Sequence, residues 1–205
     1  MWRQIYNLYL KKKTAIFIFL IFIFLLGVLF GVLALYRLEA GTRNSLFQII
    51  SGFMQGISDL KVEHSVLIKE TIGVYVGSLF LIWLLGISVI AMPLIPVIIL
   101  VKGFGLGFTA AFLIHYFDFS GFLLLVFTVL PQNIFDVPVY ILAGITGISF
   151  SIRIINYFRG RGYLYLIDFF DYTLKMMLLT VFLLFSILLE VFVSPFVFEK
   201  IIKYF

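Results

Sequence analysis

The chain of 205 residues contains no cysteine, and charged residues make up only 12% of it. Without cysteine it can form no disulfide and offers no thiolate ligand to a metal ion. Soluble domains are about half apolar and about a quarter charged, whereas 63% of this chain is hydrophobic and 26 residues are phenylalanine. The composition therefore predicts a single integral membrane domain over residues 1–205, with lipid as its main solvent.

Acidic residues are the scarcer charge, with 10 Asp and Glu against 15 Lys and Arg and a net charge of +5. A positive surplus can attract nucleic acid or anionic lipid. No basic stretch is long enough to follow a nucleic-acid backbone, and the basic residues gather beside hydrophobic runs, where the cytoplasmic leaflet attracts them. We therefore expect membrane lipid, and no nucleic acid, as a partner.

Apolar segments of the chain are predicted to cross the bilayer as helices, since a helix needs about 20 residues to span the hydrocarbon. The segment that follows three consecutive lysines is too long for a signal-peptide core and is interpreted as an uncleaved signal anchor. Interfacial helices are expected before the first crossing and before the last. The predicted fold class is all-α, a polytopic transmembrane helix bundle of about five crossings. The crossings are residues 14–36, 71–100, 103–117, 119–150 and 176–193, and the interfacial helices are residues 2–9 and 163–175.

Prolines complicate the second crossing, because Pro93 and Pro96 fall inside its apolar run. The simplest threading lets one helix end near Lys102 and the chain return through the glycine-rich residues 103–117. The alternative is a re-entrant break at the two prolines, which is tolerated where the backbone is buried in protein. The sequence leaves both threadings open.

The fourth crossing, residues 119–150, is longer than one straight passage needs. We expect a broken, tilted helix or two half-helices, with the break near residues 131–138, where polar Gln132, Asn133 and Asp136 lie between two prolines. A carboxylate at that depth is costly unless it is paired or faces water, so Asp136 is a functional candidate. In the alternative interpretation the three side chains provide hydrogen bonds to a proline-broken helix. Under either interpretation they point into the bundle.

The longest polar stretch, residues 37–70, contains a predicted amphipathic helix. Apolar residues recur three or four apart within it, after Asn44 or Ser45 as the N-cap. Lipid headgroups, the bundle or another protein must cover its apolar face. We take the centre of that face as a candidate docking surface for a partner, made of Phe47, Ile50, Phe53 and Ile57.

The distribution of basic residues predicts the orientation of the chain. With the N-terminus inside, the inner segments hold nine Lys and Arg, Lys102 among them, and the outer segments hold six that are mostly offset by acids. The positive-inside rule then places the loop 37–70 outside and the loop 153–175 inside. The expected location is the cell membrane, multi-pass, with a cytoplasmic N-terminus and an extracytoplasmic C-terminus.

Residue types that carry chemistry are sparse. The two histidines, His64 and His115, are far from each other and from any second metal ligand in the sequence. Gly103, Gly105 and Gly107 resemble a phosphate loop only formally, because no strand precedes them, and close helix packing is the better interpretation. Gly27 and Gly31 form another small-residue pair of this kind, spaced Gly-x-x-x-Gly. We expect no catalytic residue, no metal ligand and no cofactor.

Three stretches resemble a known family. They are Leu81 to Leu94 (LIWLLGISVIAMPL), Lys102-Gly103-Phe104, and Val129 to Asn133 (VLPQN). As a set they are similar to the stage II sporulation protein M family, and the resemblance covers nearly the whole chain. A broader membrane family has Pro-His-Gly-x-x-Glu-x-Pro at the third stretch, where this chain departs at Gln132 and Asn133 but keeps an acid at Asp136.

The resemblance implies a mother-cell membrane protein of endospore-forming bacteria that is needed for engulfment of the forespore. In that family the protein is similar to a scaffold at the septum, which gathers two cell-wall hydrolases, stage II sporulation proteins D and P. The hydrolases degrade peptidoglycan, and the scaffold itself is not an enzyme. The alternative from the residues alone is a small membrane transporter or channel subunit, because interrupted helices often build sites at the midplane.

Overall fold

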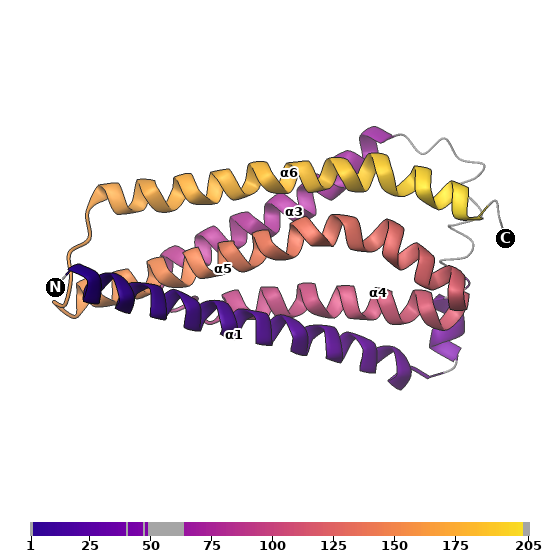
Figure 1. Ribbon diagram of the computed structural model, residues 1–205, viewed down its shortest axis with the longest axis horizontal. Coiled ribbons are helices and arrows are strands. Elements are labelled where there is room, and N and C mark those ends of the chain that lie inside the picture. The colour runs from indigo at the N-terminus through magenta and orange to yellow at the C-terminus, as the bar shows by residue number, and fades with distance from the viewer. Residues whose placement is uncertain (1, 40, 47, 49–63, 203–205) are drawn as a thin grey trace.

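The computed structural model describes residues 2–39, 41–46, 48 and 64–202. Within these residues the chain is helical, with short turns and no strand, so the all-α fold class is confirmed. Figure 1 shows the long helices lying side by side, with successive helices running in opposite directions. The elements are α1 (Trp2–Arg37), α3 (His64–Ile87), α4 (Leu94–Leu124), the π-helix η1 (Leu125–Val129), α5 (Leu130–Phe158) and α6 (Leu166–Ile202).

Among the residues that the structure describes, two helical stretches are long and apolar enough to cross a membrane. Lys13–Arg37 has 25 residues and a mean hydropathy of 3.3, and Leu94–Phe158 has 65 residues and a mean hydropathy of 2.2. Ile72–Ile87 is a shorter apolar helix. These lengths are consistent with a membrane protein, and the number of crossings stays a prediction.

The longer stretch reverses its direction at Asp118, which has a φ of 45° and a ψ of −121°. Three residues later, Gly121 packs against the part of α4 that precedes the turn. A Cβ atom on Gly121 would lie 1.9 Å from the carbonyl oxygen of Leu113. Only glycine allows two backbones to approach this closely. The tight turn therefore divides the 65-residue stretch into two antiparallel arms.

The break after α3 corrects the predicted second crossing, which does not run on to Lys102. Helix α3 ends at Ile87, residues 88–93 form a turn, and α4 begins at Leu94. Inside the turn, the backbone N–H of Ala91 donates to the hydroxyl oxygen of Ser88 at 3.3 Å. Proline is tolerated at a helix start, where an N–H would have no partner, and Pro93 occupies the N-cap position of α4.

Residues 103–117 are consequently not a separate return segment, because they continue α4 without a break. The break lies beside Pro93, where the alternative threading placed it, and separates two long antiparallel helices (Figure 1). The end of α3 is held by its neighbours: Ser151 Oγ donates to the carbonyl oxygen of Gly86 at 2.6 Å, and the Tyr172 hydroxyl donates to that of Trp83 at 2.8 Å. These bonds satisfy backbone groups near the end of the helix.

Three predicted helix boundaries are also wrong. Residues 2–9 are not a separate interfacial helix, because α1 is continuous from Trp2. Likewise α6 runs from Leu166 to Ile202, so no break separates residues 163–175 from the last crossing. Residues 41–46 are already helical, so neither Asn44 nor Ser45 is an N-cap. A helix can continue from a polar stretch into an apolar one, because the polarity of side chains does not interrupt the backbone hydrogen bonds. The polarity of the sequence is therefore a poor guide to where these helices begin and end.

Helices α1 and α4 pack backbone to backbone through their glycines, as the sequence predicted. A Cβ on Gly27 would lie 2.2 Å from the carbonyl oxygen of Leu100, and one on Gly103 would lie 2.3 Å from that of Phe24. Gly31 and Gly107 make the same approach one turn further along. Small residues at this spacing allow the close approach that drives helix association in lipid.

Helix α5 is the centre of the bundle, since it contacts α1, α3, α4 and α6. Its buried face forms the largest apolar cluster with residues of the four surrounding helices. Fully buried members of this cluster are Leu20, Ile82, Ile95, Ile99, Ala143 and Leu183. The same central position brings the polar residues of α5 beside polar residues from the neighbouring helices.

Candidate functional site

Asp136 lies on the buried face of α5, and only 4% of its surface is exposed. Its carboxylate lies beside the hydroxyl groups of Ser186 on α6 and Tyr75 on α3, and it interacts with the positive charge of Lys102 on α4. Four helices, α3, α4, α5 and α6, thus contribute one residue each to a single polar cluster, and Figure 1 shows these helices lying side by side. The sequence predicted that Asp136 points into the bundle, and the structure agrees.

Lys102 is the cationic member of this cluster. The predicted assignment of Lys102 to an inner segment at a helix end is wrong, because the residue lies within α4. Its Nζ atom lies 4.2 Å from the ring centroid of Tyr75 and 4.5 Å from that of Tyr140. Both distances are within the range of cation–π attraction, which is stronger where the cation has lost water. The two rings and the carboxylate of Asp136 together compensate a charge that would be costly in the middle of a helix bundle.

Tyr140 connects α5 to α3 beside this cation. Its hydroxyl donates to the backbone carbonyl oxygen of Tyr75 at 3.3 Å. Only 2% of Tyr140 is exposed, and a buried hydroxyl usually needs such a partner. The bond fixes the ring that lies against Lys102.

The predicted break near residues 131–138 takes a different form from two half-helices. Residues 130–158 form one helix with Pro138 inside it, and the irregularity precedes them as η1. There the N–H of Leu130 donates to the carbonyl of Leu125, five residues earlier. Pro131 has no N–H to continue the α-helical ladder, which is a reason for a local π turn.

Gln132 and Asn133 have separate roles at this irregular start of α5. Asn133 Nδ2 donates to the carbonyl oxygen of Val129 at 2.8 Å, which is the local hydrogen bonding expected for a disturbed helix. The backbone carbonyl of Gln132 accepts a bond of 3.1 Å from Ser186 Oγ, which ties α5 to α6. Of the three predicted residues, Gln132 and Asp136 therefore belong to the central cluster, and Asn133 serves the backbone.

Two buried oxygens in this region have no hydrogen-bond partner within the described part of the chain, Asp136 Oδ1 and Gln132 Oε1. A buried acceptor without a donor is costly, so such atoms are often found where a proton, an ion or water binds. The cluster combines one carboxylate, one ammonium group and several hydroxyls. That set can hold helices together by charge and can also exchange a proton, but it contains no activated nucleophile.

Histidine and metal chemistry find no support in the residues that the structure describes. No group of three His, Cys, Asp or Glu side chains lies close enough there to hold a metal ion. The ring of His115 packs edge-on against Tyr36, with centroids 5.9 Å apart. The docking candidates Phe47, Ile50, Phe53 and Ile57 lie outside the described residues, so that hypothesis stays a prediction.

The sequence interpretation missed Tyr75, Lys102, Tyr140 and Ser186 as members of the site. The sequence does contain an indication for Lys102, because it is the single charged residue between Pro93 and Asp118. If residues 94–117 are taken as one helix, this charge lies inside an apolar helix and needs a partner. The two tyrosines and the serine carry no such signal, because single polar residues are common in apolar runs.

Comparison with known proteins identifies one family. The family model described as stage II sporulation protein M matches residues 20–195, which include the whole polar cluster and the α1–α4 glycine contact. No curated protein and no solved structure matches the chain.

Proposed function

Since the chain belongs to the stage II sporulation protein M family and so has a role in sporulation, we propose that it acts there as a non-enzymatic membrane scaffold. In this proposal it gathers the septal peptidoglycan-degrading enzymes, stage II sporulation proteins D and P, in the mother-cell membrane. Those enzymes cut the wall during engulfment of the forespore. The scaffold holds them in place and contributes no chemistry.

The family match is the observation that carries this proposal. In addition, the polar residues inside the bundle bind one another and the backbones of neighbouring helices. Lys102 lies against two tyrosine rings, and Ser186 binds the backbone of α5. A further support is the connection between α1 and α3, which is much longer than the turn 88–93 and the loop 159–165. The amphipathic segment predicted within it is the proposed docking surface for the enzymes.

Copurification from sporulating cells tests the scaffold. We expect the tagged chain to recover both hydrolases, and we expect the triple change Ile50→Ser, Phe53→Ser and Ile57→Ser to release them while the protein stays inserted. A matched control changes Leu166, Ile167 and Phe170 to Ser, three apolar residues at the start of α6 that are 81%, 69% and 64% exposed. Equal recovery with both triple variants would place the docking surface elsewhere, and recovery of neither hydrolase by the unaltered chain would contradict the scaffold.

Transport of a proton or cation is a second candidate function, and one observation favours it. Asp136 Oδ1 is buried without a hydrogen-bond partner among the described residues. Ionisable groups within the membrane often belong to proton or ion pathways. The two candidate functions assign different roles to the charge of Asp136, so the substitution Asp136→Asn separates them.

A further inference from the structure

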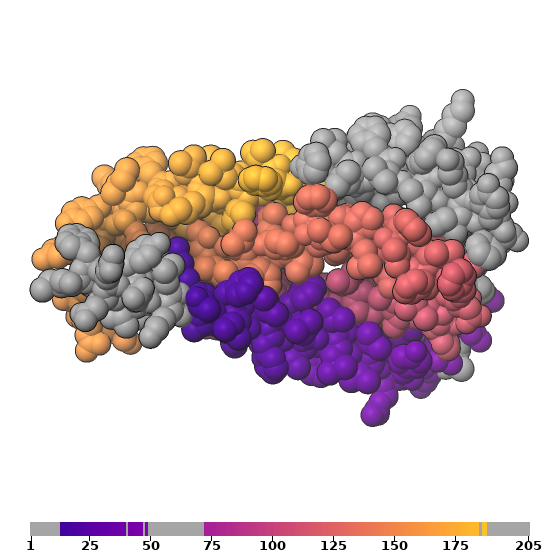
Figure 2. All heavy atoms as spheres, viewed as in Figure 1, coloured from indigo at the N-terminus to yellow at the C-terminus, as the bar shows by residue number. Residues whose placement is uncertain are grey.

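We use the name groove for the strip of surface along α5, between α1 and α6, that runs from Leu142 to the cleft beside Arg153, near the end of the bundle where α1 begins. Figure 2 shows α5 at the molecular surface between these two helices. Leu142, Thr146, Ser149 and Arg153 recur at helical spacing along it, so they share one face of α5. This face changes from apolar at Leu142 to polar and basic at Arg153.

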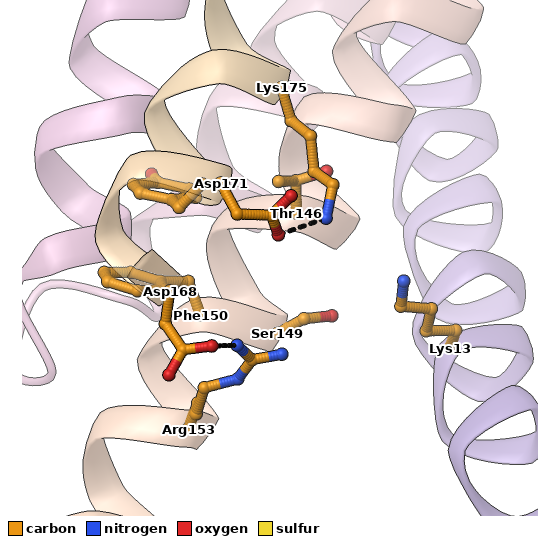
Figure 3. Close-up of a pocket in the computed structure, with 9 residues that line it drawn as sticks. Lys13, Thr146, Ser149, Phe150, Arg153, Asp168, Asp171 and Lys175 are labelled. Carbon is orange, nitrogen blue, oxygen red and sulfur yellow. Dashed lines mark hydrogen bonds and ion pairs between the residues drawn. The ribbon is translucent and has the colours of Figure 1, made fainter. Parts of the chain in front are cut away.

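The polar end of the groove is a small cleft of about 40 Å³, lined by residues of all three helices. Figure 3 shows Lys13 of α1 reaching toward Ser149 and Arg153 of α5, with Lys175 of α6 on the other side. The lining includes three basic side chains, Lys13, Arg153 and Lys175, and two acidic ones, Asp168 and Asp171, which gives a net charge of +1. An anion is therefore favoured over a cation in this cleft.

The ion pairs of the cleft orient its basic groups without exhausting their donors. Arg153 is paired with Asp168, and Lys175 is paired with Asp171. A guanidinium group has five N–H donors and an ammonium group has three, so each retains donors for a second oxygen ligand. Arginine in particular matches the geometry of a phosphate group.

Ser149 supplies an independent observation in the same place. Its hydroxyl oxygen is buried and has no hydrogen-bond partner among the described residues. Figure 3 shows that oxygen directed across the cleft toward Lys13. A hydroxyl that can donate, beside two cationic groups, is suited to an oxyanion.

The apolar part of the groove lies toward the middle of the bundle. On α5, Leu142 is 48% exposed, and on the facing side of α6, Leu178 and Phe182 are 54% and 65% exposed. Leu178 and Phe182 follow Lys175 on one face of α6, because they are three and seven residues beyond it. A ligand that fits the whole groove has an anionic group at one end and an apolar chain along its length.

We propose that this groove binds an anionic phospholipid of the cytoplasmic leaflet. Its phosphate lies between Lys13, Ser149 and Arg153, and an acyl chain follows α5 past Leu142. Basic pockets between helices on the cytoplasmic side are known to favour such headgroups. The proposal is independent of the scaffold function but uses the predicted orientation, in which the start of α1 is cytoplasmic. Phosphate is the shared chemistry of a lipid headgroup and of free phosphate, and the test separates them.

Native mass spectrometry of the full chain in detergent tests the proposal. Phosphatidylglycerol and phosphatidylcholine with the same acyl chains are the two probes, and we expect more bound phosphatidylglycerol. Loss of one basic contact at the membrane surface should weaken phosphatidylglycerol binding about fivefold, so Lys13→Ala should show that decrease and Lys13→Arg should not. Ser149→Leu, which fills the cleft, should also lower binding.

The matched control is Arg161→Ala, which removes one positive charge from the exposed loop after α5 without touching the cleft. Thermal unfolding of each variant in lipid-free detergent verifies that it is folded. Equal binding of the two lipids, or an equal decrease in Arg161→Ala and Lys13→Ala, would overturn the proposal. Displacement of bound phosphatidylglycerol by excess inorganic phosphate would show that the cleft binds the free anion and would refute the lipid site.

Discussion

The carbonyl oxygen of Val28 lies 2.1 Å from the position that a Cβ atom on Gly107 would occupy. Gly31 approaches α4 in the same way, with the carbonyl oxygen of Phe104 at 2.2 Å from its Cβ position. Each helix therefore presents glycines to the backbone of the other. Contacts this close permit dispersion attraction and weak Cα–H···O bonds along the α1–α4 interface, which replace the hydrophobic effect that is absent in lipid.

A methyl group on Gly107 should force these helices apart. We expect Gly107→Ala to lower the free energy of unfolding by about 1–3 kcal/mol, the usual cost of overpacking. Thermal unfolding of the purified protein in detergent measures the change. Gly105→Ala on the same helix is the control, since a Cβ there meets no described atom within 4 Å. Similar stability of both variants would mean that α1 and α4 are not in close contact.

Asp118 has the positive φ of a position that favours glycine, and its φ and ψ resemble the first central residue of a type II′ turn. We expect Asp118→Gly to raise the free energy of unfolding by about 1 kcal/mol or more, because a sparsely populated backbone conformation with positive φ costs an L-residue on the order of 1–3 kcal/mol. Asp118→Val should lower it by a similar amount or more, whereas Asp118→Asn should change it little. A valine variant that unfolds at the wild-type temperature would contradict the turn.

Asp136 separates the scaffold from the transporter. If the carboxylate mainly accepts hydrogen bonds, for example from the hydroxyl of Tyr75, Asp136→Asn keeps one acceptor and engulfment should proceed. Asp136→Leu should then lower the amount of folded protein, because each unsatisfied buried donor costs roughly 1–3 kcal/mol. Fluorescence microscopy of sporulating cells and immunoblotting measure engulfment and protein amount.

A transport carboxylate has to bind and release a proton or cation, so the Asn variant would then lose function at normal abundance. The control is Asp118→Asn, which changes an exposed carboxylate at the turn within α4. Arrested engulfment in the Asp136→Asn cells alone, with normal abundance and intact partner recovery, would favour the transporter.

The orientation of the bundle can be tested in this cysteine-free chain. With Lys102 removed from the count because it lies within α4, the predicted inner segments still hold eight basic residues against six outside. We expect a single cysteine at Ser58 to react with an impermeant thiol reagent in intact cells, whereas a single cysteine at Asn156 should react only after permeabilisation. The reverse pattern would invert the topology and remove the cytoplasmic lipid site with it.

The amino-acid sequence by itself determined that the chain is a bundle of apolar helices. It also placed Asp136 in the interior and assigned Gly27 and Gly31 to helix packing. These features follow from composition and from the spacing of single residues, because an apolar chain in lipid must satisfy its backbone hydrogen bonds within helices. The resemblance read from residues 81–94, 102–104 and 129–133 likewise agrees with the family match.

The tertiary structure decided where the helices end and which residues meet. The end of α3 within an apolar run depends partly on bonds from distant residues, such as Ser151 to Gly86, that no local pattern contains. Lys102 is tolerated in mid-helix because rings from two other helices and the carboxylate of Asp136 surround it. Hydropathy describes each residue alone, whereas the energy of a buried charge is set by the partners that folding brings to it.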